Sequence, residues 1–82
     1  MKQWNSRLRE EITPRTLTEL YGNERLLVEH HRGIVSYGTE QIRIRATYGY
    51  LITEGENLRL CCMNRTQLVI CGRIRCVRME EG

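Results

Sequence analysis

The chain has 82 residues, of which 40% are hydrophobic and 28% charged, which is ordinary for one soluble globular domain with a thin core. So short a chain has little room for both a deep catalytic cleft and its supporting core, so size favours a binding or structural module over an enzyme. No apolar run approaches the roughly 18–20 residues of a membrane helix, and the first residues lack the apolar centre of a signal peptide. We therefore expect a cytoplasmic protein with reduced thiols.

Charge is distributed unevenly along the chain. The net charge is +3, yet residues 1–40 balance to zero, while residues 41–78 contain seven arginines against two glutamates. Arginine supplies 12 of the 13 cationic side chains. Arginine pairs with carboxylate or phosphate through two hydrogen bonds, so recognition of anions is one explanation of this bias. A GC-rich or heat-adapted source would produce the same bias.

Residues 1–15 read as a lead segment. Residues 3–12 could form a short helix, and Thr13-Pro14 should end it because the residue before proline avoids helical angles. The segment is short and polar, so a flexible lead is the alternative. We place a single β domain at residues 16–82.

From Thr16 onward the pattern is of strands and turns only. The clearest strand is 40–47, where Ile42, Ile44 and Ala46 alternate with polar residues at period two. The predicted strands, separated by turn signals that include glycine, asparagine or arginine, are 16–21, 25–31, 34–37, 40–47, 50–53, 58–63 and 67–79. The spacing predicts an all-β protein, an antiparallel β-meander of about six strands forming a small barrel or sandwich.

Two hairpins allow a register to be predicted. A two-residue loop at Tyr48-Gly49 would place Ala46 opposite Leu51 and Ile44 opposite Thr53. A slip of one residue would put arginine on the apolar face, so the pattern itself favours this arrangement.

The second hairpin has a three-residue loop at 64–66, which would place Leu60 opposite Ile70 and Cys62 opposite Leu68. After Ile74 the next apolar residue on this strand is three positions on, and this odd step indicates a β-bulge near Arg75-Cys76.

Four cysteines lie within sixteen residues, at Cys61, Cys62, Cys71 and Cys76. Adjacent residues on a strand point to opposite faces, so Cys61 and Cys62 cannot readily share a metal. We expect Cys62 in the core, Cys61 and Cys71 on the opposite face, no structural disulfide in a reducing cytosol, and no metal or other cofactor.

The histidines and the acids offer no catalytic set. His30 and His31 are adjacent and therefore diverge, so we expect one beside Val28 in the interior and one in solvent. The chain contains no aspartate, nothing visibly activates a cysteine, and no glycine-rich phosphate loop is present. We expect no enzymatic activity.

The arginines of the second half are the candidate binding residues. Alternation places five of them on one outer sheet face: Arg43, Arg45, Arg59, Arg73 and Arg75. A solvated face with cross-strand pairing is the ordinary interpretation, and a patch for an acidic protein, nucleic acid or anionic lipid is the sharper one. Only Tyr48 and Tyr50 lie near this face, so it lacks the interleaved aromatics that stack on bases.

Several motifs carry a family resemblance over residues 16–79. They are T-L-T-E-L-Y-G-N-E at 16–24, E-x-H-R-G-I at 29–34, L-I-x-x-G-x-x-L at 51–58 and I-x-G-x-I-x-x-V at 70–77. Together they resemble the YabP/YqfC family of small sporulation proteins, with a closer likeness to the YqfC branch. Thr53 stands where the family more often has an aliphatic residue, and the cysteines and dense arginines are not part of its pattern. The family-pattern structural residues are Glu29, His31, Arg32, Gly33, Gly49, Gly55 and Gly72.

The resemblance implies a role in endospore formation, in the mother cell, with no catalytic residues and with a membrane-protein partner. Our leading hypothesis is therefore a non-enzymatic protein acting through protein–protein contacts or assembly, as an adaptor peripheral to a membrane or as a homo-oligomer. We expect the contacts at strand edges near 25–31 and 67–79 and at the arginine face. The alternative is a small β-barrel that binds nucleic acid or anionic lipid through the arginine face, and a zinc-dependent fold is a third option.

Overall fold

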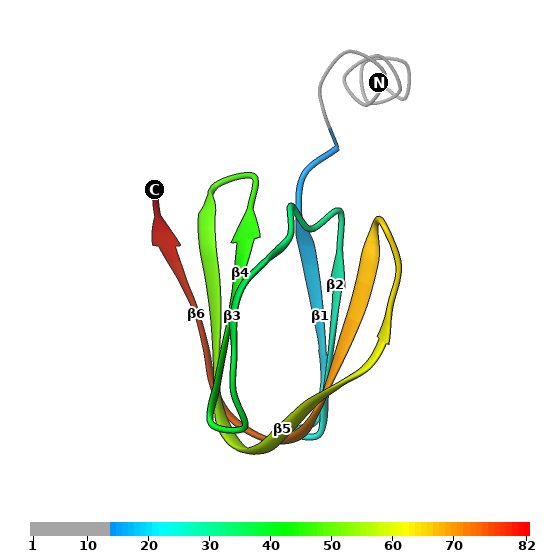
Figure 1. Ribbon diagram of the computed structural model, residues 1–82, viewed down its shortest axis with the longest axis vertical. Helices are drawn as coiled ribbons and strands as arrows, with labels where there is room; N and C mark the ends of the chain where they lie inside the picture. Colours follow the sequence, from blue (N-terminus) through cyan, green and yellow to red (C-terminus); the bar gives the residue numbers. More distant parts are fainter. Residues whose placement is uncertain (1–13) are drawn as a thin grey trace, which may run out of the picture.

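The fold consists of β-strands in one antiparallel sheet. A computed structural model describes residues 14–82, and the helix predicted at residues 3–12 lies outside them. The all-β class is confirmed. The six strands in chain order are β1 (Leu17–Tyr21), β2 (Arg25–Glu29), β3 (Ile34–Tyr37), β4 (Gln41–Ala46), β5 (Gly49–Met63) and β6 (Gln67–Glu81) (Figure 1).

The strand order in the sheet is β1-β2-β6-β5-β4-β3. Strands β3 to β6 form the predicted meander, whereas the β1–β2 hairpin joins the sheet along β6. The sheet is therefore open and does not close into a barrel, which was one of the two predicted forms, because within residues 14–82 β1 and β3 have no strand on their outer sides.

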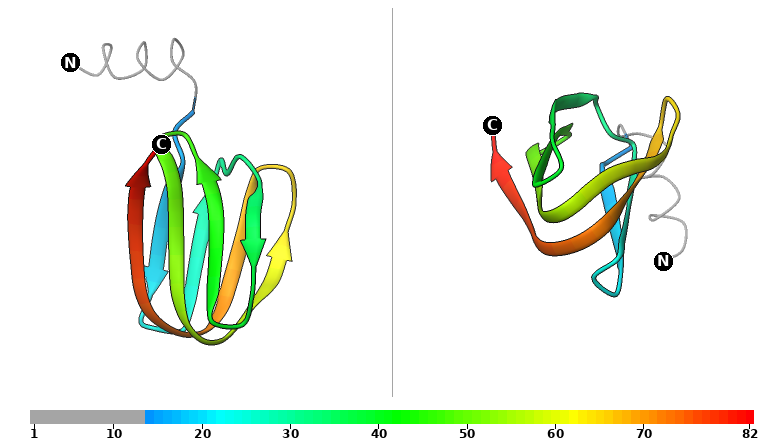
Figure 2. Two further views of the ribbon diagram at one scale, coloured as in Figure 1. Left: turned by 60° about the vertical axis from the view of Figure 1, so that its left-hand side comes forward. Right: turned by 60° about the horizontal axis from the view of Figure 1, so that its bottom comes forward.

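A sharp bend in β5 and β6 gives the sheet its shape. The two predicted strands at 50–53 and 58–63 are one continuous strand of 15 residues, and the turn signal between them marks the bend. Figures 1 and 2 show both long strands curving through the bottom of the molecule. One side of the bend, the β2 arm, holds β1 and β2 with residues 59–63 and 67–71; the other, the β4 arm, holds β3 and β4 with residues 49–54 and 76–81.

Two glycines of the family pattern permit the bend. At Gly55 an added Cβ would collide with the backbone carbonyl of Arg73 on the neighbouring strand. Gly72 has a φ of +138°, a conformation that other residues rarely adopt, and its added Cβ would meet the backbone of Asn57. The strands can therefore approach closely at the bend only because these positions lack side chains.

The core fills the space between the two arms. Period-two alternation directs apolar side chains of both arms inward, and Ile34, Leu60 and Val77 pack at the margin. The buried cluster consists of Leu26, Val28, Ile42, Ile44, Leu51, Leu58, Leu68, Ile70 and Ile74.

The β4–β5 register differs from the prediction by two residues. Ala46 pairs with Gly49 and Ile44 with Leu51, because the turn lies at Thr47-Tyr48 and not one position later. A shift of two preserves the face of every side chain, so the predicted inward residues are still inward.

The predicted β5–β6 register agrees with the structure at Leu60 and Ile70 but differs from it towards the β5–β6 turn. Leu60 pairs with Ile70 as predicted, but a bulge between Leu60 and Cys62 places Cys62 opposite Val69. Cys62 is consequently exposed, which corrects its assignment to the core. The bulge predicted near Arg75 is confirmed, since the register shifts between Ile74 and Cys76.

The connection from β2 to β3 is tied down by His31, the interior histidine of the predicted pair. His31 is 9% exposed, and its Nε2 lies 2.9 Å from the backbone oxygen of Asn64 in the β5–β6 turn. The backbone N–H of Gly33 donates to His31 Nδ1 at 3.1 Å, so Nε2 carries the proton.

Among residues 14–82 no helix is long and apolar enough to cross a membrane.

Candidate binding surfaces

On the outer face of the β4 arm, arginine side chains lie beside an aromatic side chain, Tyr50, and an aliphatic one, Ile52. The guanidinium carbons of Arg43 and Arg45 lie 5.5 and 5.1 Å from the ring centroid of Tyr50, within cation–π range. Ile52 is fully buried on this face, between its cross-strand partners Arg43 and Arg78. The aliphatic stems of arginine therefore cover apolar surface here. The sequence reading missed Arg78 because the bulge at Arg75 changes the alternation after it.

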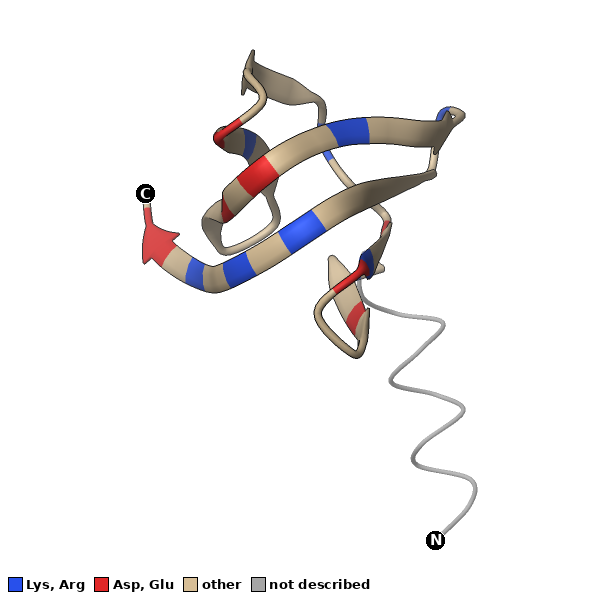
Figure 3. Ribbon diagram, turned by 90° about the horizontal axis from the view of Figure 1, so that it is seen from below, with Lys and Arg blue, Asp and Glu red and all other residues tan. Residues whose placement is uncertain are grey.

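Acidic residues accompany much of the arginine surface. Three arginines form ion pairs: Arg43 Nη2 with Glu80 Oε1 at 2.8 Å, Arg75 Nη2 with Glu56 Oε2 at 2.7 Å, and Arg78 Nη1 with Glu54 Oε2 at 3.3 Å. These pairs are solvent-exposed, so each contributes little to stability. Figure 3 shows basic segments along β6 on the convex side, with acidic segments on the neighbouring β5 and at the C-terminal end of β6.

The five predicted arginines do not share one flat face. Arg43 and Arg45 lie on the β4 arm, Arg73 and Arg75 lie at the bend, and Arg59 lies on the β2 arm opposite Cys71. They follow the curved convex surface because β5 and β6 bend between them. Within residues 14–82, Arg45, Arg59 and Arg73 make no ion pair.

A hollow of about 950 Å³ lies at the open end of the β4 arm. Three arginines from separate segments line it: Arg15 before β1, Arg32 in the β2–β3 connection and Arg45 on β4. Tyr48 and Tyr50 form part of the same wall. Of these arginines, Arg45 was predicted from the sequence as a binding residue and Arg32 only as a residue of the family pattern. Arg15 was missed, because its distance of 30 residues from Arg45 gives no local signal.

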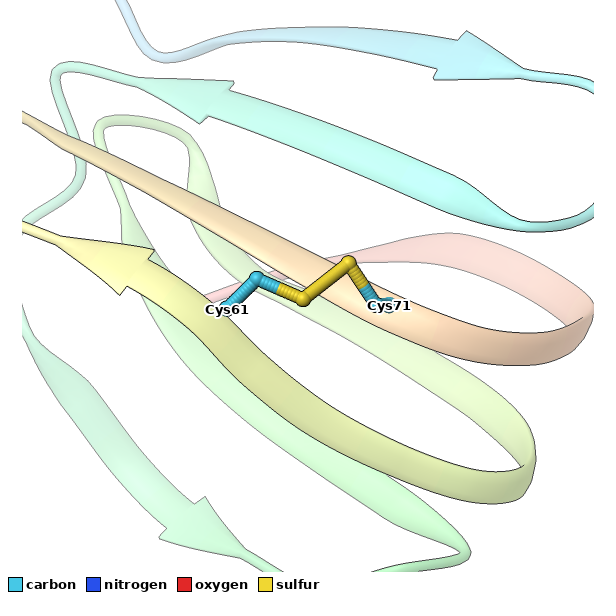
Figure 4. The surroundings of a disulfide bond; sticks show 2 residues. All are labelled: Cys61 and Cys71. Carbon is cyan, nitrogen blue, oxygen red and sulfur yellow. A yellow bond between two sulfur atoms is a disulfide. The ribbon is translucent and has the colours of Figure 1, made fainter.

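The cysteines are arranged differently from the prediction. Cys61 and Cys71 do lie on the same outer face, but they form a disulfide with a Cα–Cα distance of 6.1 Å (Figure 4). This corrects the expectation of no disulfide. The pairing follows from the register, since Cys71 lies opposite Arg59 and the bulge brings Cys61 alongside. Cys62 and Cys76 are free thiols.

No three histidine, cysteine or glutamate side chains of residues 14–82 gather as a metal site would require. His30 has a φ of 59°, and His31 uses both ring nitrogens within the fold.

Strand edges expose apolar side chains. On β1, Leu17 is 56% exposed, Leu20 52% and Tyr21 50%, and Val35 and Tyr37 of β3 are similarly exposed. The edge predicted near 25–31 is wrong, because β1 covers β2. The edge predicted near 67–79 exists in part: residues 67–71 pair on both sides, whereas residues 76–81 pair only with β5.

The fold and these surfaces define a small all-β protein whose candidate sites are surface patches and strand edges. A family model described as the YabP family matches residues 13–82, so the chain belongs to the YabP family. This is a family of sporulation proteins that are generally non-catalytic. The resemblance seen in the sequence is thereby confirmed, while the match does not separate the YqfC branch from the rest of the family. No curated protein and no solved structure gives a significant match to the chain.

The structure gives the family motif E-x-H-R-G-I a physical meaning. Glu29 Oε2 accepts a hydrogen bond from Gln67 Nε2 at 3.1 Å, and His31 joins the β2–β3 connection to the β5–β6 turn. The backbone N–H of Arg32 donates to the Arg45 carbonyl at 2.8 Å, and the Arg45 N–H donates to Gly33 at 2.8 Å. The motif therefore fastens the connection that crosses the open end of the fold.

Proposed function

We propose that this protein acts in endospore formation without catalysis, by binding a protein partner through the edge strand β1. The observation that carries the proposal is that all five residues of β1 are exposed and that its outer edge is unpaired within the described chain. An unpaired edge presents backbone N–H and C=O groups to a partner strand, and exposed apolar side chains add specificity. Membership of a family of sporulation proteins supports the biological setting.

A shallow depression beside β1 strengthens the choice of this edge. It has a volume of about 280 Å³ and is lined by Leu17 and Leu27 with the acidic side chains Glu19 and Glu29. A partner strand with an apolar residue flanked by basic residues would match both the surface and its charge. We place this partner in the mother cell, in or at a membrane, with the present chain as the cytoplasmic adaptor.

The test is a pull-down from sporulating cells that includes the membrane fraction. Leu20→Lys puts a charge on the β1 edge, while Val35→Lys puts the same charge on the β3 edge at similar exposure, 47% against 52%. We expect Leu20→Lys to lose the partner and Val35→Lys to keep it. Equal capture by both variants would refute the β1 site, and normal heat-resistant spores after gene deletion would refute the role in sporulation.

A second copy of the chain is the other partner that this edge could take. Size-exclusion chromatography over a range of concentrations distinguishes the two. A dimer that Leu20→Lys abolishes and Val35→Lys preserves would identify self-association as the function of β1.

A further inference from the structure

Hydrogen bonds that involve the main chain connect the three segments that line the hollow at the open end of the β4 arm. The N–H of Thr16 donates to Thr47 Oγ1 at 3.0 Å, which places Arg15 beside the β4–β5 turn. The N–H of Arg32 donates to the Arg45 carbonyl at 2.8 Å, so these two arginines are also neighbours. The three arginines line one hollow because these hydrogen bonds bring their main-chain segments together.

The arginines that line the hollow form no ion pair within residues 14–82. None of Arg15, Arg32 and Arg45 has a carboxylate within ion-pair distance, whereas the nearby Glu80 is engaged by Arg43. Arg45 lies against the Tyr50 ring, which limits its orientations. Burial raises the pKa of Tyr48, so its hydroxyl stays protonated at neutral pH.

We propose that this hollow binds the phosphate group of a phosphorylated ligand, through Arg15, Arg32 and Arg45. A phosphate monoester carries a charge of about −1.5 to −2 near neutral pH and three strong acceptor oxygens. Three guanidinium groups supply paired N–H donors in a geometry that matches such a group, and one carboxylate would leave much of this charge unmatched. The inference is independent of the β1 edge, which lies on the other arm.

The first test is a titration of the full ¹⁵N-labelled chain with inorganic phosphate at low ionic strength, followed by NMR. We expect saturable shifts of the amides at 45–50 and of Arg32. Arg32→Gln and Arg15→Gln should each weaken binding about tenfold, as expected for loss of one hydrogen bond between charged groups. Neither side chain takes part in the core, so both variants should fold, and the amide spectrum checks that they do.

Arg59→Gln is the matched control, because Arg59 is exposed, makes no ion pair within residues 14–82 and lies on the other arm. Its removal changes the net charge equally and should leave phosphate binding unchanged. Equal weakening by all three variants would show diffuse attraction and overturn the proposal. If acetate shifts the same amide signals with the same affinity as phosphate, the proposal is also overturned. The absence of amide shifts with phosphate would overturn it as well.

The phosphate group could belong to a soluble metabolite or to a lipid headgroup. Glycerol 3-phosphate in the same NMR titration probes the first source, and flotation with vesicles containing phosphatidic acid, whose headgroup is a phosphate monoester, probes the second. In either experiment the proposal requires that Arg15→Gln and Arg32→Gln reduce binding and that Arg59→Gln does not. The probe whose binding responds to the three variants in this way identifies the source of the phosphate group. If neither probe gives this order of variants, the site is refuted.

Discussion

Two buried threonines should respond to the same substitution with opposite signs. Thr53 is fully buried between Ile42 and Val77, and its hydroxyl finds no hydrogen-bond partner among residues 14–82. Thr16 is 5% exposed, and its hydroxyl donates to the His30 carbonyl at 2.7 Å and accepts from the Thr47 N–H at 3.0 Å. Valine has nearly the shape of threonine but cannot form either hydrogen bond.

Thr53→Val removes a desolvated polar group, whose burial without a partner costs about 1–3 kcal/mol. We therefore expect the free energy of unfolding to rise by about 1–3 kcal/mol, with a Tm increase of about 4–8 °C per kcal/mol for a domain of this size. Thr16→Val leaves a carbonyl and an N–H unpaired, so we expect a loss of about 1–3 kcal/mol.

The assay is urea denaturation followed by circular dichroism, with the slope of the transition compared between variants. Thermal unfolding provides a second reading. An unchanged or lowered stability for Thr53→Val would refute the reasoning, because it would mean that the hydroxyl has a partner in solution.

Three further predictions concern the bend, the disulfide and an ionisable side chain. Gly55→Ala should destabilise the protein by about 2–3 kcal/mol through collision with the neighbouring strand, whereas Gly38→Ala, whose added Cβ has its nearest atom at 3.4 Å, should be close to neutral; equal stabilities in urea would contradict this account of the bend. Reduction of Cys61–Cys71, which closes a loop with a sequence separation of 10, should cost about 2–3 kcal/mol, and identical urea midpoints with and without reductant would show that the pair does not form. Burial raises the pKa of Tyr48 above 10.0, so the unfolded chain releases the phenolic proton first, and the stability that this group contributes below pH 10.0 is lost as the pH rises further. The difference in phenolate absorbance between the wild type and Tyr48→Phe measures the shift. A titration of this difference at or below pH 10.0 would contradict the prediction.

Local alternation and turn spacing predicted the features of the fold that depend on a single strand or a single hairpin. The inward faces of Ile42 and Ile44, and the pairing of Leu60 with Ile70, follow from period two and turn spacing. The bulge near Arg75 was also visible, because a step of three apolar positions cannot occur on a regular strand.

The features that were missed depend on the relation between distant segments. The glycine-containing stretch Glu54–Asn57 reads as a turn in isolation, and only the neighbouring strand shows that Gly55 permits a close approach instead. The bulge near Cys61 leaves no trace in the apolar pattern because Cys61, Cys62 and Met63 are all exposed. Arg15 reaches the hollow because its neighbour Thr16 donates a hydrogen bond to Thr47, 31 positions away, and Arg32 reaches it through a hydrogen bond to Arg45, 13 positions away.

The pairing of β2 with β6 has a consequence for synthesis of the chain. Residues 25–29 have their partners at 67–71, so the first hairpin to leave the ribosome cannot join the sheet until nearly the whole chain has been made. Closing so long a loop slows folding, and the apolar side chains of β1 and β2 remain accessible meanwhile. The nascent protein should therefore be a substrate for chaperones that bind short apolar segments, and a delay in translation before Gln67 should increase its aggregation.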